Sequence, residues 1–343
     1  MIIRSRAPLR IGLAGGGTDV SPYSDLYGGA ILNATINLFA HATILPRSDN
    51  KIRLTALDQE IDLELDATET LPIDGKLDLI KGVYNRIVKD FTGEPFGFGI
   101  STFVDAPPGS GLGSSSTLVI AVLGAFVEWL NLPLGEYDIA HLAYEIERVD
   151  LGFAGGKQDQ YAATFGGWNF MEFSSGDKVI VNPLRVKQEY INEIEYSLLL
   201  YYTDSSRISS TIIEKQSENV VKKKRKPVEA MHQLKRQSVM MKEAVLRGQL
   251  SQMGEILDFG WQHKKQMANG ISNPDIESMY SDARAHGATG GKISGAGGGG
   301  FMILYCPENT RFQVVNALSK YEGRFQRYQF TTRGLTTWKT AEE

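Results

Sequence analysis

The stretch Ala106-Pro107-Pro108-Gly109-Ser110-Gly111-Leu112-Gly113-Ser114-Ser115-Ser116 is the most informative part of the sequence. Its alternating glycines let the backbone pass close to a ligand without a Cβ in the way. The serines open an apolar segment, 117–130, in which Leu118, Val122 and Phe126 recur at helical spacing. A glycine loop that enters a helix presents unpaired backbone N–H groups and the positive end of the helix dipole. We therefore interpret this loop as an anion site, and phosphate is the commonest ligand of such sites.

The loop matches neither of the two common nucleotide-binding patterns, G-x-x-x-x-G-K-[ST] and G-x-G-x-x-G. The nearest approach to the first pattern is 287–292, which is one residue short and is followed by Ile293. An ordinary P-loop or dinucleotide fold is thus disfavoured. Taken alone, the loop could also be a plain turn that joins a strand to a helix.

Composition sets the broad class of protein. A chain of 343 residues with 42% hydrophobic and 22% charged residues is typical of a globular protein of about two domains. A net charge of −4 gives no reason to expect nucleic acid or an anionic membrane as a partner. The single cysteine, Cys306, excludes an internal disulfide, and the start of the chain does not resemble a signal peptide. We expect a cytoplasmic protein with a small-molecule partner, and the oligomeric state stays open.

Apolar periodicity and turn residues predict an α+β fold of two domains, 1–190 and 191–343. Start signals at Pro227 and Asn273 and a stop signal at Gly287 predict a largely helical region over 206–286. Strands are expected at 31–45, 52–56, 61–65, 98–104, 167–173, 196–202, 301–306, 324–330 and 335–339, and further helices at 77–91, 117–130, 135–149 and 311–320.

Two further glycine clusters and one acidic segment carry chemistry. Asp19 follows three glycines and could accept hydrogen bonds from a polyol, or it could instead cap a helix. The glycine run in 292–300 indicates close approach to a ligand or another backbone. Glu147 and the Ser115 hydroxyl suit Mg²⁺, while Asp159 could orient or deprotonate a nucleophile in phosphoryl transfer. Taken singly, each acid could also be a surface charge.

Together these segments resemble the GHMP kinase superfamily, which includes galactokinase and the homoserine and mevalonate kinases. Its motifs match 8–19, 107–116 and 292–299, in that order, and its acid-bearing segment matches 147–159. The resemblance implies ATP and Mg²⁺ as cofactors. It also implies an N-terminal domain like ribosomal protein S5 domain 2 and a C-terminal ferredoxin-like domain with extra helices.

The resemblance also implies a role for particular residues. Asp159 would be catalytic, and Ser115 and Glu147 would bind the metal. The ATP phosphates would contact Pro108, Gly109, Ser110, Gly111, Leu112, Gly113, Ser114, Ser115 and Ser116. The substrate would contact Arg10, Gly17, Thr18, Asp19, Lys157, Arg207, Gly297 and Gly298, with Arg10, Lys157 and Arg207 as the candidates for binding a phosphate on the substrate.

Within the superfamily, the sequence looks most like the branch that phosphorylates the anomeric hydroxyl of sugars. The run 15–19 replaces the G-x-H-x-D form common in galactokinases. That run, with 155–160 and 205–207, is most similar to bacterial kinases of D-glycero-D-manno-heptose 7-phosphate, which serve GDP-heptose synthesis. The alternatives are a 1-kinase for an unphosphorylated fucose, arabinose or N-acetylhexosamine, a non-catalytic ATP and sugar sensor, and a diphosphomevalonate decarboxylase.

Overall fold

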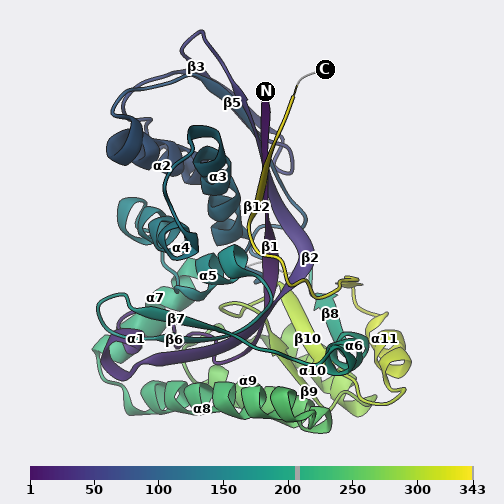
Figure 1. The fold of residues 1–343 in the computed structure, drawn as a ribbon. Helices are drawn as coiled ribbons and strands as arrows, with labels where there is room; N and C mark the ends of the chain where they lie inside the picture. Colours follow the sequence, from purple (N-terminus) through teal and green to yellow (C-terminus); the bar gives the residue numbers. More distant parts are fainter. Residues whose placement is uncertain (205–208, 342–343) are drawn as a thin grey trace.

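The computed structural model describes residues 1–204 and 209–341, which form two β-sheets with helices packed against them (Figure 1). The larger sheet has the order β12-β1-β2-β5-β3-β4, and β6 pairs with both β2 and β7. All of its pairs are antiparallel except β3 with β5. Its strands are β1 (Ile2–Ala14), β2 (Gly29–Pro46), β3 (Lys51–Ala56), β4 (Ile61–Asp66), β5 (Phe98–Val104), β6 (Trp168–Phe173), β7 (Val179–Pro183) and β12 (Thr336–Thr340).

The predicted glycine loop and helix are confirmed in the structure. Helix α3 (Ser114–Leu130) begins directly after Gly113 and is buried from Ser116 to Phe126, because it packs against β1 and β2. Gly109, Gly111 and Gly113 all have positive φ, between 73° and 81°. Residues with a Cβ rarely adopt this conformation, so the alternating glycines are what lets the loop turn into the helix.

The acid-bearing segment differs from the single helix expected at 135–149. Helix α4 (Glu136–Glu145) continues as a π-helical turn, η2 (Ile146–Asp150), and α5 (Gln158–Phe165) follows a short loop. A π-turn adds a residue to the helical turn and changes which side chains face inward, which apolar periodicity does not reveal. Here it buries Glu147 completely. Before this segment lie α1 (Tyr23–Tyr27), α2 (Asp78–Ile87) and a second π-turn, η1 (Val88–Thr92).

The smaller sheet has the order β11-β8-β10-β9, formed by β11 (Arg324–Phe325), β8 (Leu198–Tyr202), β10 (Phe301–Tyr305) and β9 (Gly290–Ile293). All five residues of β10 are buried, as the continuous apolar run predicts. The helical region is confirmed over its described residues, from Ser209 onward, and Asn273 caps its last helix by accepting a hydrogen bond from the Ile276 N–H at 2.9 Å. The helices are α7 (Ser209–Val221), α8 (Arg225–Arg247), the 3₁₀ turn η3 (Leu250–Gln252), α9 (Met253–Lys264), α10 (Pro274–Ala285) and, later, α11 (Arg311–Leu318).

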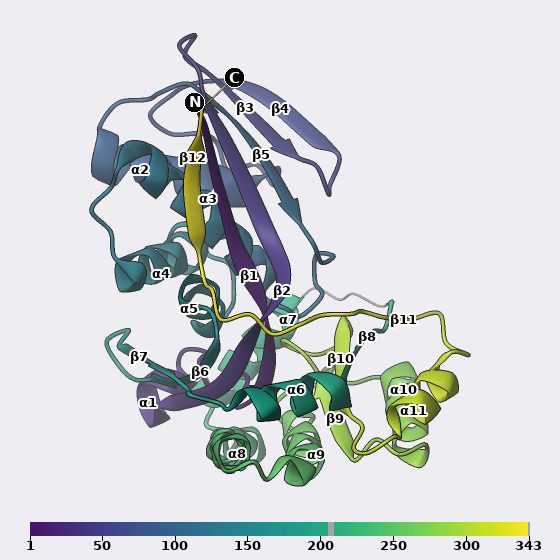
Figure 2. The ribbon, with the colours of Figure 1, turned by 45° about the vertical axis from the view of Figure 1, so that its right-hand side comes forward.

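The chain passes from the larger sheet to the smaller one through α6 (Gln188–Ser197). It later returns, since β12 pairs with β1 and brings Thr340 opposite Ile2, so the two ends of the chain lie together in Figure 2.

The domain limits at 190 and 191 stay a prediction. The α+β class is confirmed. No helix among the described residues is long and apolar enough to cross a bilayer.

Candidate active site

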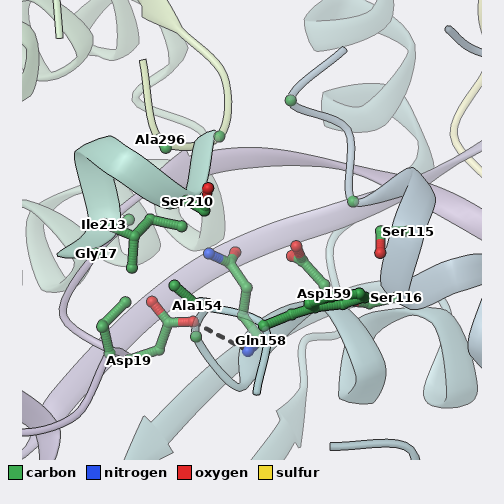
Figure 3. A pocket seen from close by; sticks show the side chains of 18 of the residues that line it. Gly17, Asp19, Ser115, Ser116, Ala154, Gln158, Asp159, Ser210, Ile213 and Ala296 are labelled. Atoms are coloured by element: carbon green, nitrogen blue, oxygen red, sulfur yellow. Dashed lines mark hydrogen bonds between the residues drawn. The ribbon is translucent and has the colours of Figure 1, made fainter. Parts of the chain in front are cut away.

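A cavity of about 690 Å³ lies where the three glycine motifs meet. Its walls come from distant parts of the chain: the first motif, the glycine loop, the segment 152–159 apart from Lys157, helix α7, Lys264 of α9 and the tip of the third motif. Figure 3 shows Asp19 and Gly17 on one side, Ser115 and Ser116 on the other, and Gln158 and Asp159 between them. The motifs that the sequence singled out therefore converge on one hollow.

The glycine loop forms one side of this cavity. Its lining residues are Pro108, Gly109, Gly111, Gly113, Ser114, Ser115 and Ser116. The remaining loop residues Ser110 and Leu112 are completely buried and do not line the cavity. The Leu112 carbonyl accepts a hydrogen bond from the backbone N–H of Arg10 at 3.1 Å. The loop is fixed to the third motif because the Ser294 hydroxyl donates to the Gly111 carbonyl at 2.7 Å. A Cβ on Gly111 would lie 2.5 Å from the Ser294 carbonyl oxygen, so only glycine permits this contact.

Asp159 lies beside the start of α3 and is held by Arg10. The Arg10 Nε and a terminal guanidinium nitrogen both lie 2.7 Å from Asp159 Oδ1, and the other terminal nitrogen donates to the Gly111 carbonyl at 2.6 Å. Arg10 is only 3% exposed. A charged pair with additional hydrogen bonds to a fixed backbone holds its carboxylate in one place. Asp159 is thereby set at the junction of the glycine loop and the Asp19 side of the cavity.

Glu147 and Ser115 form an oxygen-rich corner next to the loop. The Ser115 hydroxyl, which lines the cavity, donates to Glu147 Oε1 at 3.0 Å. The Gln160 amide donates to Glu147 Oε2 at 2.5 Å and to the Ser116 hydroxyl at 3.1 Å, which orients the buried carboxylate. Mg²⁺ prefers one or two protein oxygens together with phosphates and water. The donor set therefore fits Mg²⁺, and the described residues contain no cluster of three or more His, Cys, Asp or Glu that would favour another kind of metal site.

Asp19 lies on the opposite side, almost fully buried, and accepts a hydrogen bond from the Gln158 N–H at 3.0 Å. Burial raises the pKa of the Asp19 carboxyl, and the hydrogen bond from Gln158 opposes that shift. Gly17 also lines the cavity. Thr18 points away, because its hydroxyl bonds to the Gly15 and Ala30 carbonyls at 2.8 and 3.1 Å.

The third motif reaches the cavity through Gly295 and Ala296. Gly297 and Gly298 lie behind that tip, where the Gly298 N–H donates to the Ile271 carbonyl at 2.8 Å. A Cβ on Gly297 would lie 2.8 Å from Ile271, so this glycine serves close backbone packing. The roles expected for Gly297 and Gly298 in binding substrate stay predictions.

The basic residues expected near a substrate phosphate have different surroundings. Arg10 is engaged with Asp159, as described above. Lys157 is buried outside the cavity lining, where its Nζ lies 2.7 Å from Asp177 and 3.6 Å from Asp25. Arg207 lies outside the described residues.

The sequence analysis assigned no role to two buried lysines near the cavity, although Lys292 begins the third motif. Lys264 lines the cavity and is 3% exposed, and Lys292 donates to the Gly12 carbonyl at 2.8 Å. Burial lowers the pKa of Lys264 to about 7 and that of Lys292 well below its ordinary value. Lys264 falls at the end of helix α9 with no motif around it, so nothing in the sequence distinguishes it from the partly exposed lysine next to it, Lys265.

A glycine loop that opens onto the start of a helix, beside a carboxylate fixed by an arginine, is the arrangement expected of a phosphotransferase. Two family models match the sequence: the N-terminal domain of GHMP kinases over residues 78–167 and the C-terminal domain of GHMP kinases over residues 241–323. The chain belongs to the GHMP kinase family, and the expected resemblance is confirmed.

Its relatives include sugar kinases from several organisms. The D-glycero-alpha-D-manno-heptose 7-phosphate kinase of Campylobacter jejuni is 48% identical over 98% of this chain and 99% of its own length. The crystal structure of a D-glycero-D-manno-heptose 1-phosphate kinase from Bacteroides thetaiotaomicron superposes on this chain with a TM-score of 0.85 and 45% sequence identity. The match covers 99% of this chain and 100% of the chain in that crystal structure. The L-fucokinase/L-fucose-1-P guanylyltransferase of Bacteroides fragilis is 27% identical over 88% of this chain and 34% of its own length.

Proposed function

We propose that this kinase transfers the γ-phosphate of ATP to the anomeric hydroxyl of D-glycero-D-manno-heptose 7-phosphate, giving the 1,7-bisphosphate, in the cytoplasm. The observation that carries the proposal is the position of Asp159. It lies in one cavity with the glycine loop on one side and Asp19 on the other, and Arg10 fixes it there. A sugar hydroxyl next to Asp159 would face a phosphate held by the loop.

The glycine loop and α3 supply the phosphate-binding side. The first residues of α3 follow three glycines whose backbone turns into the cavity, so N–H groups and the helix dipole favour a polyphosphate there. Ser115 and Glu147 would hold Mg²⁺, which neutralises phosphate charge when bound. Gln160 keeps the Glu147 carboxylate turned toward Ser115.

Asp159 and Asp19 supply the sugar side. Asp159 orients the attacking hydroxyl and accepts its proton as the new bond to phosphorus forms, because positioning dominates catalysis of phosphoryl transfer. Asp19 is held by the Gln158 N–H, and its second oxygen can accept hydrogen bonds from sugar hydroxyls. Asp19 and Asp159 both line the cavity, so both carboxylates could contact a bound sugar.

The names of two similar kinases differ, since one is described as a 7-phosphate kinase and the other as a 1-phosphate kinase. We favour the 7-phosphate as substrate because the sequence resembles kinases of the anomeric hydroxyl. A panel assay that couples ADP release to NADH oxidation tests this choice. It compares the heptose 7-phosphate, the heptose 1-phosphate, the free heptose and L-fucose.

The proposal predicts that kcat/KM is highest for the 7-phosphate. A preference for the 1-phosphate or for a free sugar would contradict it. Binding of ATP and sugar without ADP release would instead indicate a sensor.

A further inference from the structure

Lys264 is a buried cation that faces the cavity without a carboxylate partner. Its Nζ donates to the Gly295 carbonyl and lies 3.5 Å from the Ile293 carbonyl oxygen. Within the described part of the chain, no Asp or Glu oxygen lies within ion-pair distance of this nitrogen. A buried ammonium with carbonyl partners alone is costly for the folded protein. Such a group at a cavity wall is suited to receive an anion.

Lys264 lines the cavity and is bonded to the third motif. It is bound to Gly295, and the neighbouring Ala296 lies on the side of Gly17 and Ile213 in Figure 3, opposite Ser115. A Cβ on Gly17 would touch Met267, three residues after Lys264, so the end of α9 and the first motif meet here. Lys264 also lies close enough to Asp19 to interact with its charge, while its partner Gly295 packs against Gly111 of the glycine loop.

The other basic side chains around the cavity are held by partners within the protein. Arg10 holds Asp159. Arg148 lies by the loop, where it donates to the Ser116 hydroxyl at 3.3 Å and lies 3.7 Å from Glu147. Lys157 is paired with Asp177 outside the lining, and Lys292 is bonded to the Gly12 carbonyl. Among the described lysines, Lys264 is thus the one that lines the cavity.

We propose that Lys264 binds the phosphate that the sugar substrate already carries and so selects a phosphorylated sugar over the free one. The inference rests on the proposed function. A 1-kinase of a terminally phosphorylated sugar needs a cation on the sugar side of the site, and Lys264 lines the cavity beside the first motif and near Asp19.

The electrostatic surroundings of Lys264 support this role. Burial and the nearby charge of Arg10 lower the pKa of Lys264 to about 7, with Asp19 acting in the opposite direction, while Lys292 adds a further neighbouring amine. Glu214 of α7 also lines this cavity. A phosphate dianion would favour the charged ammonium, so binding of the sugar phosphate should be accompanied by proton uptake.

The test compares Lys264→Met with the matched control Lys265→Met. Lys265 is the adjacent lysine, partly exposed and 3.1 Å from Glu277. For Lys264→Met we expect the KM for the heptose 7-phosphate to rise roughly 10- to 100-fold, because a charge-assisted hydrogen bond is lost. The KM for ATP and the kcat/KM for the free heptose should stay within about threefold, since neither depends on this phosphate contact. The control should behave like the wild type with all three.

Different results overturn different claims. If Lys264→Met lowers kcat/KM equally for phosphorylated and free heptose, or changes neither, Lys264 does not bind the distal phosphate. If the wild type releases no ADP with the heptose 7-phosphate, the proposed function itself fails.

A measurement on the wild type covers the case in which the variant does not fold. Calorimetry in two buffers of different ionisation enthalpy, at about pH 8, should detect uptake of up to about one proton per heptose 7-phosphate bound and none for the free heptose. Equal proton uptake for both ligands would overturn the assignment.

Discussion

Replacing Asp159 with Asn tests whether this carboxylate acts in the reaction or only in the fold. The substitution keeps the shape of the side chain but removes its charge and its capacity to accept a proton. Because Asn can still accept one hydrogen bond from Arg10, the expected loss in the free energy of unfolding is modest, about 1–2 kcal/mol. The expected fall in kcat is about 10²- to 10⁴-fold, the usual range for a general base.

The assay measures ADP release and ATP affinity on the same preparation. The KM for ATP should change little, because Asp159 contacts Arg10 and the sugar side. Asp150→Asn is the matched control: it removes the charge from a second Arg–Asp pair, with Arg86 Nε 2.8 Å from Asp150, outside the cavity. It should cost similar stability and leave kcat unchanged. A kcat for Asp159→Asn within tenfold of the wild type would refute the assigned role.

Three further substitutions test the loop, the metal corner and the buried lysine. Gly111→Ala should lower the unfolding free energy, measured by thermal melting, by more than about 2 kcal/mol and should weaken ATP binding. Gly75 has φ +88° and open space around it, so Gly75→Ala should lower the unfolding free energy by only about 1 kcal/mol. Equal losses for the two variants would contradict the close contact of Gly111 with Ser294. Ser115→Ala should raise the Mg²⁺ concentration for half-maximal activity about tenfold or more, and an unchanged Mg²⁺ titration would remove Ser115 from the metal site. Between pH 7 and the ordinary Lys pKa of about 10.4, Lys264 carries a proton in the unfolded chain but not in the folded protein. The unfolding free energy of the wild type should therefore rise with pH by up to about 1.4 kcal/mol per pH unit more than that of Lys264→Met. Parallel pH profiles of the two proteins, measured by chemical denaturation, would contradict this.

The glycine motifs could be recognised from the sequence because their glycines meet local requirements of the backbone. Gly111 and Gly113 need positive φ and have another chain segment where a Cβ would point, so their spacing reflects a physical constraint. The Asn273 cap and the apolar strand β10 are likewise local features.

The remaining features depend on contacts between distant parts of the chain. The pairing of β12 with β1 joins opposite ends of the sequence, which periodicity within a window does not indicate. The pairing of Lys157 with Asp25 and Asp177, and the position of Lys264 in the cavity, follow from tertiary packing. Position in the sequence alone therefore does not indicate that Lys264 lines the cavity while Lys157 does not.

The central claim is that one cavity holds the nucleotide phosphates next to the anomeric end of a phosphorylated heptose. ³¹P NMR of the reaction of ATP with D-glycero-D-manno-heptose 7-phosphate tests it most directly. We predict a new anomeric phosphate resonance coupled to H1 that grows as the γ-phosphate signal of ATP disappears, while the 7-phosphate signal persists. ATP consumption that places the phosphate on any other sugar oxygen, or releases it as inorganic phosphate, would contradict the account.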